Sequence, residues 1–94
     1  MAIGKIVKEI PKSLWELTSE KLIDLILNSP NADKMPSDLA KTILYYWQRD
    51  QLKTEAGLER LLEASLIVDP EATTKIMEDL GLRELIVAIK EATK

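Results

Sequence analysis

Apolar residues recur every three or four positions along nearly the whole chain, and no clear run of alternating apolar and polar residues competes with that spacing. This is the period of an α-helix, because residues three and four positions apart share one helix face. Prolines, asparagines and glycines divide the chain into short stretches, since these residues interrupt helices. The sequence therefore predicts an all-α fold, a compact bundle of four to six short helices.

The 94 residues match the length of a single domain. We expect an N-terminal amphipathic arm over residues 1–11 and a single helical domain over residues 12–94. A segment as short as the arm is not a stable helix alone, so it needs a surface to fold on. That surface is its own bundle, a groove on a partner protein, or a second copy that exchanges arms to make a homodimer. The aliphatic residues of the arm, spaced as on a helix, are Ile3, Ile6, Val7 and Ile10.

Polar capping residues mark where the later helices should begin. The side chain of a serine, threonine or aspartate at the N-cap accepts a hydrogen bond from a free backbone amide. Gly81 should end the helix before it in the left-handed region. The dense apolar residues between Leu17 and Leu27 predict a central, largely buried helix. The expected N-caps are Ser13, with Glu16 closing a capping box, Ser37, Thr54, and Asp69 ahead of Pro70.

Three of the four aromatic residues are consecutive, Tyr45, Tyr46 and Trp47, in a helix expected to run from Ser37 to about Leu52. Neighbouring residues on a helix point about 100° apart, so the three rings cannot share one face. The apolar arc of this helix predicts that Tyr46 and Trp47 lie in the core or at its rim. Tyr45 is predicted to lie outside.

On the outside, Tyr45 shares a stripe with Lys41 and Arg49, because the three residues are four positions apart. One interpretation is a solvated face, on which the ring covers the stems of its basic neighbours and attracts their charge. The other is a binding surface, since Tyr and Arg are enriched at interface hot spots and an aromatic ring flanked by cations also suits stacking on nucleic-acid bases. The candidate partner-binding residues are Ile3, Ile6, Val7, Ile10, Lys41, Tyr45 and Arg49.

No catalytic or metal-binding pattern is visible. The chain has no His and no Cys, which removes the commonest general base and any disulfide or zinc–thiolate site. Gly4, Gly57 and Gly81 are too scattered to form a phosphate-binding loop, and adjacent acids such as Glu78 and Asp79 diverge on a helix. We therefore expect a non-enzyme without a cofactor or a metal.

Charge and hydropathy narrow the classes of partner. The net charge of −3 gives no general attraction to nucleic acid or to an anionic membrane. The longest apolar run, Leu85 to Ile89, is far too short for a membrane span, and the N-terminus lacks the apolar stretch of a signal peptide. We expect a cytoplasmic protein with no membrane partner. Abundant Lys and Glu, few Asn and Gln and the absence of Cys lean towards a thermophilic source.

Residues 76–89, IMEDLGLRELIVAI, resemble two known helical motifs. Their apolar residues and Gly81 fall on helix-turn-helix positions, but Met77 stands where that motif prefers a small residue, and the second helix offers few donors to base edges. The stretch also resembles the closing part of a sterile-alpha-motif domain, a small five-helix protein-interaction module, although the usual Gly and Arg inside the last turn are absent. A helix hairpin ended by Gly81 explains the same residues, and we assign the chain to neither family.

These features predict a small protein–protein interaction module, an adaptor or accessory subunit of a larger complex. Its partner is another protein, which the sequence does not name. The alternative is a nucleic-acid-associated protein, such as a small accessory subunit of a DNA polymerase-like machine, that touches DNA lightly through its basic N-terminal arm. Residues 1–12 carry three lysines against one glutamate. The two classes differ in salt dependence, because nucleic-acid binding weakens steeply with salt.

Overall fold

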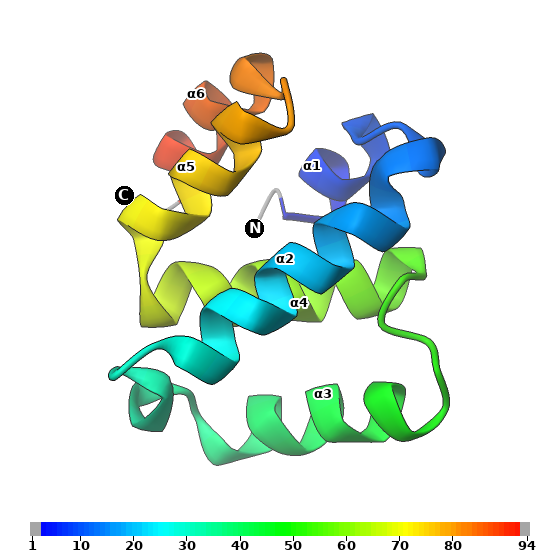
Figure 1. Ribbon diagram of the computed structural model, residues 1–94, viewed down its shortest axis with the longest axis vertical. Coiled ribbons are helices and arrows are strands. Elements are labelled where there is room, and N and C mark those ends of the chain that lie inside the picture. Colours follow the sequence, from blue (N-terminus) through cyan, green and yellow to red (C-terminus); the bar gives the residue numbers. More distant parts are fainter. Residues whose placement is uncertain (1–2, 93–94) are drawn as a thin grey trace.

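The computed structural model describes residues 3–92, which form six α-helices and two short 3-10 helices (Figure 1). No strand occurs in this part of the chain, and the predicted all-α bundle is confirmed. Residues 1–2 of the expected arm and 93–94 of the expected domain lie outside the described residues. In chain order the elements are α1 (Ile3–Glu9), η1 (Lys12–Leu14), α2 (Trp15–Asn28), η2 (Ala32–Lys34), α3 (Ser37–Gln48), α4 (Glu55–Val68), α5 (Pro70–Asp79) and α6 (Arg83–Ala92).

Helix α4 lies at the centre of the bundle and contacts α1, α2, α3 and α5 (Figure 1). The prediction that α2 is the central buried helix is wrong, because α2 leaves Leu17 and Leu27 exposed. Small residues such as Gly57 and Ala64, both buried, let neighbours approach α4 on several faces. The buried residues of α4 are Gly57, Leu58, Leu61, Leu62, Ala64, Ser65, Leu66 and Val68.

Helix α1 packs against α4 and α6. Lys8 adds an ion pair across the first of these contacts, with its Nζ 3.9 Å from Glu55 Oε1. The apolar side of the N-terminal segment therefore faces the chain's own bundle, the first of the three surfaces considered for it. None of its aliphatic side chains is more than 6% exposed: Ile3, Ile6, Val7 and Ile10.

Two of the four predicted N-caps are confirmed. Thr54 Oγ1 accepts a hydrogen bond from the Gly57 backbone amide at 3.2 Å. Asp69 Oδ1 accepts one from the Ala72 amide at 3.1 Å, and the residue that follows it is the first of α5. Gly81 also has the expected left-handed conformation after α5, with φ of 77°.

The other two predicted caps, Ser13 and Ser37, are wrong, and a proline precedes the helical turn in both places. An N-cap residue has extended backbone angles, and here those angles belong to Pro11 and Pro36, with ψ of 134° and 141°. Ser13 consequently lies inside η1, and Ser37 is already the first residue of α3. Neither α2 nor α3 has a side-chain hydrogen bond at its N-cap.

Helix α3 ends at Gln48, four residues before the predicted end near Leu52. Asp50 interrupts the right-handed helix because its φ is +55°, a left-handed conformation that aspartate tolerates better than most residues. The Gln51 backbone amide donates a hydrogen bond to the Tyr46 carbonyl oxygen at 2.8 Å, which closes the turn. Leu52 is buried, but it belongs to this turn and not to the helix. The α3–α4 turn, residues 49–54, thereby returns the chain to α4.

Candidate functional site

Helix α3 lies at the edge of the molecule and, among the described helices, contacts α4 alone. Figure 1 shows it at the lower end of the bundle, while α1, α5 and α6 gather at the other end. Only Leu39 and Ile43 of this helix are buried. Most of the surface of α3 is therefore free of contacts within the described chain.

Exposed apolar side chains concentrate on this free surface. Of the seven large hydrophobic side chains that are exposed within residues 3–92, three lie on α3: Leu44, Tyr45 and Trp47, at 52%, 51% and 48%. The prediction that Tyr45 lies outside is confirmed, and Tyr46 packs against the core as predicted. The prediction for Trp47 is wrong, because α4 covers only a narrow arc of the helix.

The stripe predicted from the sequence forms on the outside of α3. The Arg49 guanidinium lies over the Tyr45 ring, with its Cζ 3.7 Å from the ring centroid, and Arg49 Nη1 donates a hydrogen bond to the Tyr45 carbonyl oxygen at 3.4 Å. The Tyr45 and Tyr46 rings meet edge to face, with centroids 5.7 Å apart. Lys41 is exposed one helical turn earlier. The cation–π contact of the first interpretation is thus present, and the stripe remains open to solvent.

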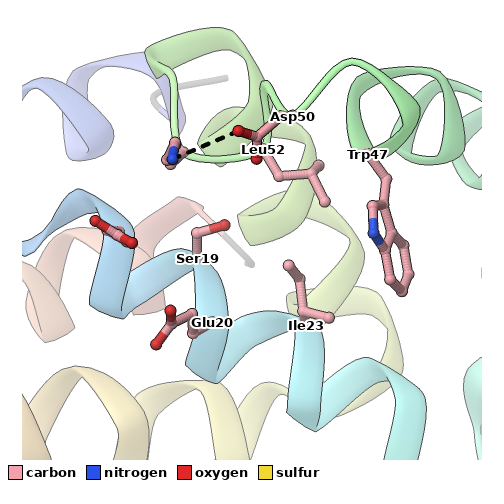
Figure 2. Close-up of a pocket in the computed structure, with 8 residues that line it drawn as sticks. Ser19, Glu20, Ile23, Trp47, Asp50 and Leu52 are labelled. Carbon is pink, nitrogen blue, oxygen red and sulfur yellow. Dashed lines mark ion pairs between the residues drawn. The ribbon is translucent and has the colours of Figure 1, made fainter.

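Trp47 forms one wall of a pocket of about 150 Å³ between α2 and the α3–α4 turn. Figure 2 shows Ser19 and Ile23 on the α2 side, with Asp50 and Leu52 on the opposite side. The Asp50 carboxylate pairs with Lys53, whose Nζ is 3.6 Å from Asp50 Oδ2. Sequence reasoning missed this pocket because it placed Trp47 in or beside the core. The lining residues are Glu16, Ser19, Glu20, Ile23, Trp47, Asp50, Leu52 and Lys53.

Ser19 differs from the other buried hydroxyl residues. Thr18, Ser65 and Thr73 each donate to a backbone carbonyl of their own helix or its cap, at 2.6, 3.0 and 2.8 Å. Ser19 is only 4% exposed, yet its hydroxyl forms no hydrogen bond within residues 3–92. Every fully buried side-chain oxygen or nitrogen in that range has a hydrogen-bond partner. The unpartnered Ser19 oxygen is therefore not fully buried, and it is open to the pocket that Ser19 lines.

The second predicted surface, the aliphatic face of α1, is separate from α3. Helix α1 contacts α4 and α6 but not α3, so the structure does not bring the two sets of candidate residues together. In this fold a partner can reach Lys41, Tyr45 and Arg49, which are all exposed. It cannot reach the buried side chains of α1 unless that helix leaves its place.

Neither a cluster of metal-ligating side chains nor a membrane-spanning helix occurs in the described part of the chain. Within residues 3–92, no group of three or more His, Cys, Asp and Glu residues is arranged to hold a metal ion. None of the helices in that range combines the length and the apolar character needed to cross a bilayer.

No protein-family model matches the chain, and no curated protein or solved structure is significantly similar to it. A function must therefore be argued from the free surface of α3 and the pocket beside it.

Proposed function

We propose that the protein is a small, non-catalytic interaction module, an adaptor or accessory subunit of a larger complex, that docks on another protein through the outer face of α3. The observation behind this is that α3 is held by α4 alone and exposes Leu44, Tyr45 and Trp47, with Arg49 exposed directly after its last residue. Tyr, Trp and Arg are the residue types most enriched at interface hot spots. Clustered apolar side chains on a soluble protein mark interaction sites.

The outer face of α3 is partly organised before binding. Because Arg49 already lies over the Tyr45 ring, docking would freeze fewer free rotations of these two side chains, and less entropy would be lost. Lys41 adds a second exposed positive charge on the same side of the helix. This combination suits a partner surface that carries an apolar patch beside acidic groups.

Affinity purification of the tagged full chain from its native host tests this docking surface. The variant Leu44→Ala/Tyr45→Ala shortens two exposed side chains of α3 and should lose the partners that the wild type retains. The control Leu27→Ala/Val87→Ala shortens two exposed side chains on other helices and should keep them. Retention of every partner by Leu44→Ala/Tyr45→Ala, with unchanged circular dichroism, would contradict the proposal.

The aliphatic face of α1 was the other surface predicted to bind a partner or a second copy. Ile3, Ile6 and Val7 of α1, which packs on α4 and α6, and Ile10 directly after it are all buried, so such binding would require this segment to detach. In the proposal made here these residues stabilise the bundle. A partner-binding role for Ile3, Ile6, Val7 and Ile10 stays a prediction.

The second candidate function is light contact with nucleic acid, as in an accessory subunit of a DNA polymerase-like machine. Exposed lysines near the N-terminus favour it: Lys5, Lys8 and Lys12. Fluorescence anisotropy with a labelled duplex at low and moderate salt distinguishes the two functions. Binding that weakens steeply with salt supports the nucleic-acid function, and an absence of binding at low salt eliminates it. The cytoplasmic location and thermophilic source expected from the sequence stay predictions.

A further inference from the structure

The pocket beside Trp47 carries more negative charge than its surroundings neutralise. Its lining holds three carboxylates and a single ammonium group. Lys53 is paired with Asp50, whereas Glu16 and Glu20 form no ion pair within residues 3–92. Like charges four positions apart on a helix repel and destabilise it. A cation bound beside these two glutamates would relieve that repulsion.

Ser19 gives a second indication of a ligand that does not depend on charge. Buried polar side chains nearly always have a hydrogen-bond partner, but this hydroxyl, on a residue 4% exposed, has none within the described residues. Figure 2 shows the hydroxyl directed from α2 into the space below Asp50 and Leu52. It is placed to accept a hydrogen bond from a group that enters the pocket.

The size and the apolar wall of the pocket limit what can enter. Sites for whole small-molecule ligands usually measure about 300–1,000 Å³, which is well above the roughly 150 Å³ found here. A cavity of about 150 Å³ can hold a group the size of a benzene ring. Trp47 adds an aromatic ring, the type that attracts cations most strongly to its face. One flat, positively charged group fits these limits.

We propose that this pocket binds a single arginine side chain presented by the protein that docks on α3, an inference that rests on the proposed function. A guanidinium group is planar, always charged and carries five N–H donors. It would donate to Ser19 Oγ and to the carboxylates of Glu16 and Glu20, while the Trp47 indole forms the apolar wall at the other end of the pocket. A lysine ammonium carries the same charge but is a compact donor without the planar fork that can reach the carboxylates and the hydroxyl together, so arginine is the better occupant.

A peptide titration of the full chain tests the pocket without the unidentified partner. The probe is acetyl-Gly-Arg-Gly-amide, followed by ¹H–¹⁵N correlation spectra. Saturable shifts are expected at the Trp47 indole N–H and the Ser19 amide. The citrulline peptide, which has the same shape without the charge, should bind at least about tenfold more weakly, since charge-assisted hydrogen bonds are lost. Equal binding of the citrulline or lysine peptide, or shifts confined to other faces, would overturn the assignment.

Matched variants separate the pocket from the rest of the surface. Glu16→Gln/Glu20→Gln keeps the shape and should weaken the arginine peptide about tenfold or more, and Ser19→Ala should weaken it by a smaller factor. Glu84→Gln/Glu91→Gln removes two exposed carboxylates from α6, which contacts neither α2 nor α3 within the described chain, and should change nothing. If the glutamine pair of the pocket binds like the wild type, the arginine site is refuted.

The two proposals fail in different ways. If the arginine peptide does not bind but Leu44→Ala/Tyr45→Ala still loses its partners, the docking surface stands and the arginine pocket falls. If the peptide binds in the pocket and Leu44→Ala/Tyr45→Ala keeps every partner, the pocket stands as an arginine-binding site and the α3 docking surface falls.

Discussion

Gly57 lies so close to the Gln51 backbone that a Cβ atom on the glycine would collide with the Gln51 carbonyl oxygen and come within 2.7 Å of Leu52 Cα. Both atoms belong to the backbone, so neither can swing away as the end of a side chain could. This close approach seats the α3–α4 turn on the first turn of α4. The absence of a side chain at Gly57 thereby lets the turn that carries Asp50 and Lys53, two lining residues of the pocket, lie against α4.

We expect Gly57→Ala to destabilise the protein by about 1–3 kcal/mol, the usual cost of forcing extra atoms into a packed site. Chemical denaturation measures the loss. The matched control is Gly4→Ala, where the new Cβ would meet only the end of the Glu59 side chain. That side chain can move, and alanine is the better helix former by about 1 kcal/mol, so the control should be neutral or stabilising. Equal stability of Gly57→Ala and the wild type would show that the turn is not held this way.

The left-handed backbone of Asp50 predicts a clear order among substitutions there. Asp50→Asn should stay within about 0.5 kcal/mol, because asparagine tolerates this conformation and the exposed ion pair with Lys53 stabilises little. Asp50→Val should cost about 1–3 kcal/mol, since a β-branched residue is strained at positive φ. Thermal unfolding of the two variants compares them directly. Valine as stable as asparagine would contradict the turn geometry.

Trp47 should matter little for stability, because it is 48% exposed and does not pack on the core. We expect Trp47→Ala to cost about 1 kcal/mol or less. Leu62→Ala, in the fully buried part of α4, should cost about 2–5 kcal/mol. Urea denaturation of both variants gives the comparison. Similar losses would place Trp47 in the core after all.

Deletion of residues 1–11 should destabilise or aggregate the protein. It removes four buried aliphatic side chains, and burial of each such side chain is worth about 1.5–3 kcal/mol. It also exposes the apolar surfaces of α4 and α6 that α1 covers. Light scattering and thermal unfolding of the full and truncated chains measure both effects. A truncated chain that stays monomeric with an unchanged melting temperature would contradict the packing role of α1.

Asp69 and Ser37 are both predicted from the sequence as N-caps, but their substitution by alanine should have different effects on stability. Asp69→Ala should cost about 0.5–2 kcal/mol, because the carboxylate accepts the Ala72 amide hydrogen bond. Ser37→Ala should stay within about 0.5 kcal/mol, since Ser37 is exposed and is not the cap of α3. The denaturation midpoints of the two variants, each compared with that of the wild type, measure these losses. An effect of Ser37→Ala as large as that of Asp69→Ala would restore the cap that the sequence predicts.

Features that depend on near neighbours in the chain can be predicted from local sequence patterns. Helical spacing predicts the bundle, and the caps at Thr54 and Asp69 need only a backbone amide three residues on. The left-handed glycine after α5 is equally local. On the candidate site, the spacing of Tyr45 and Arg49 was enough to place both on one stripe of α3, because residues four apart on a helix are neighbours.

Which helix faces are covered, and where distant segments meet, depends on how the whole chain packs. The apolar residues of α2 suggest a central helix, but α4 occupies the centre because it is the helix that four others pack against. Trp47 is exposed because only α4 covers α3, and the width of a buried arc depends on how many neighbours a helix has. The pocket joins Ser19 of α2 to Asp50 of the α3–α4 turn, and no local spacing rule relates two residues so far apart in the chain.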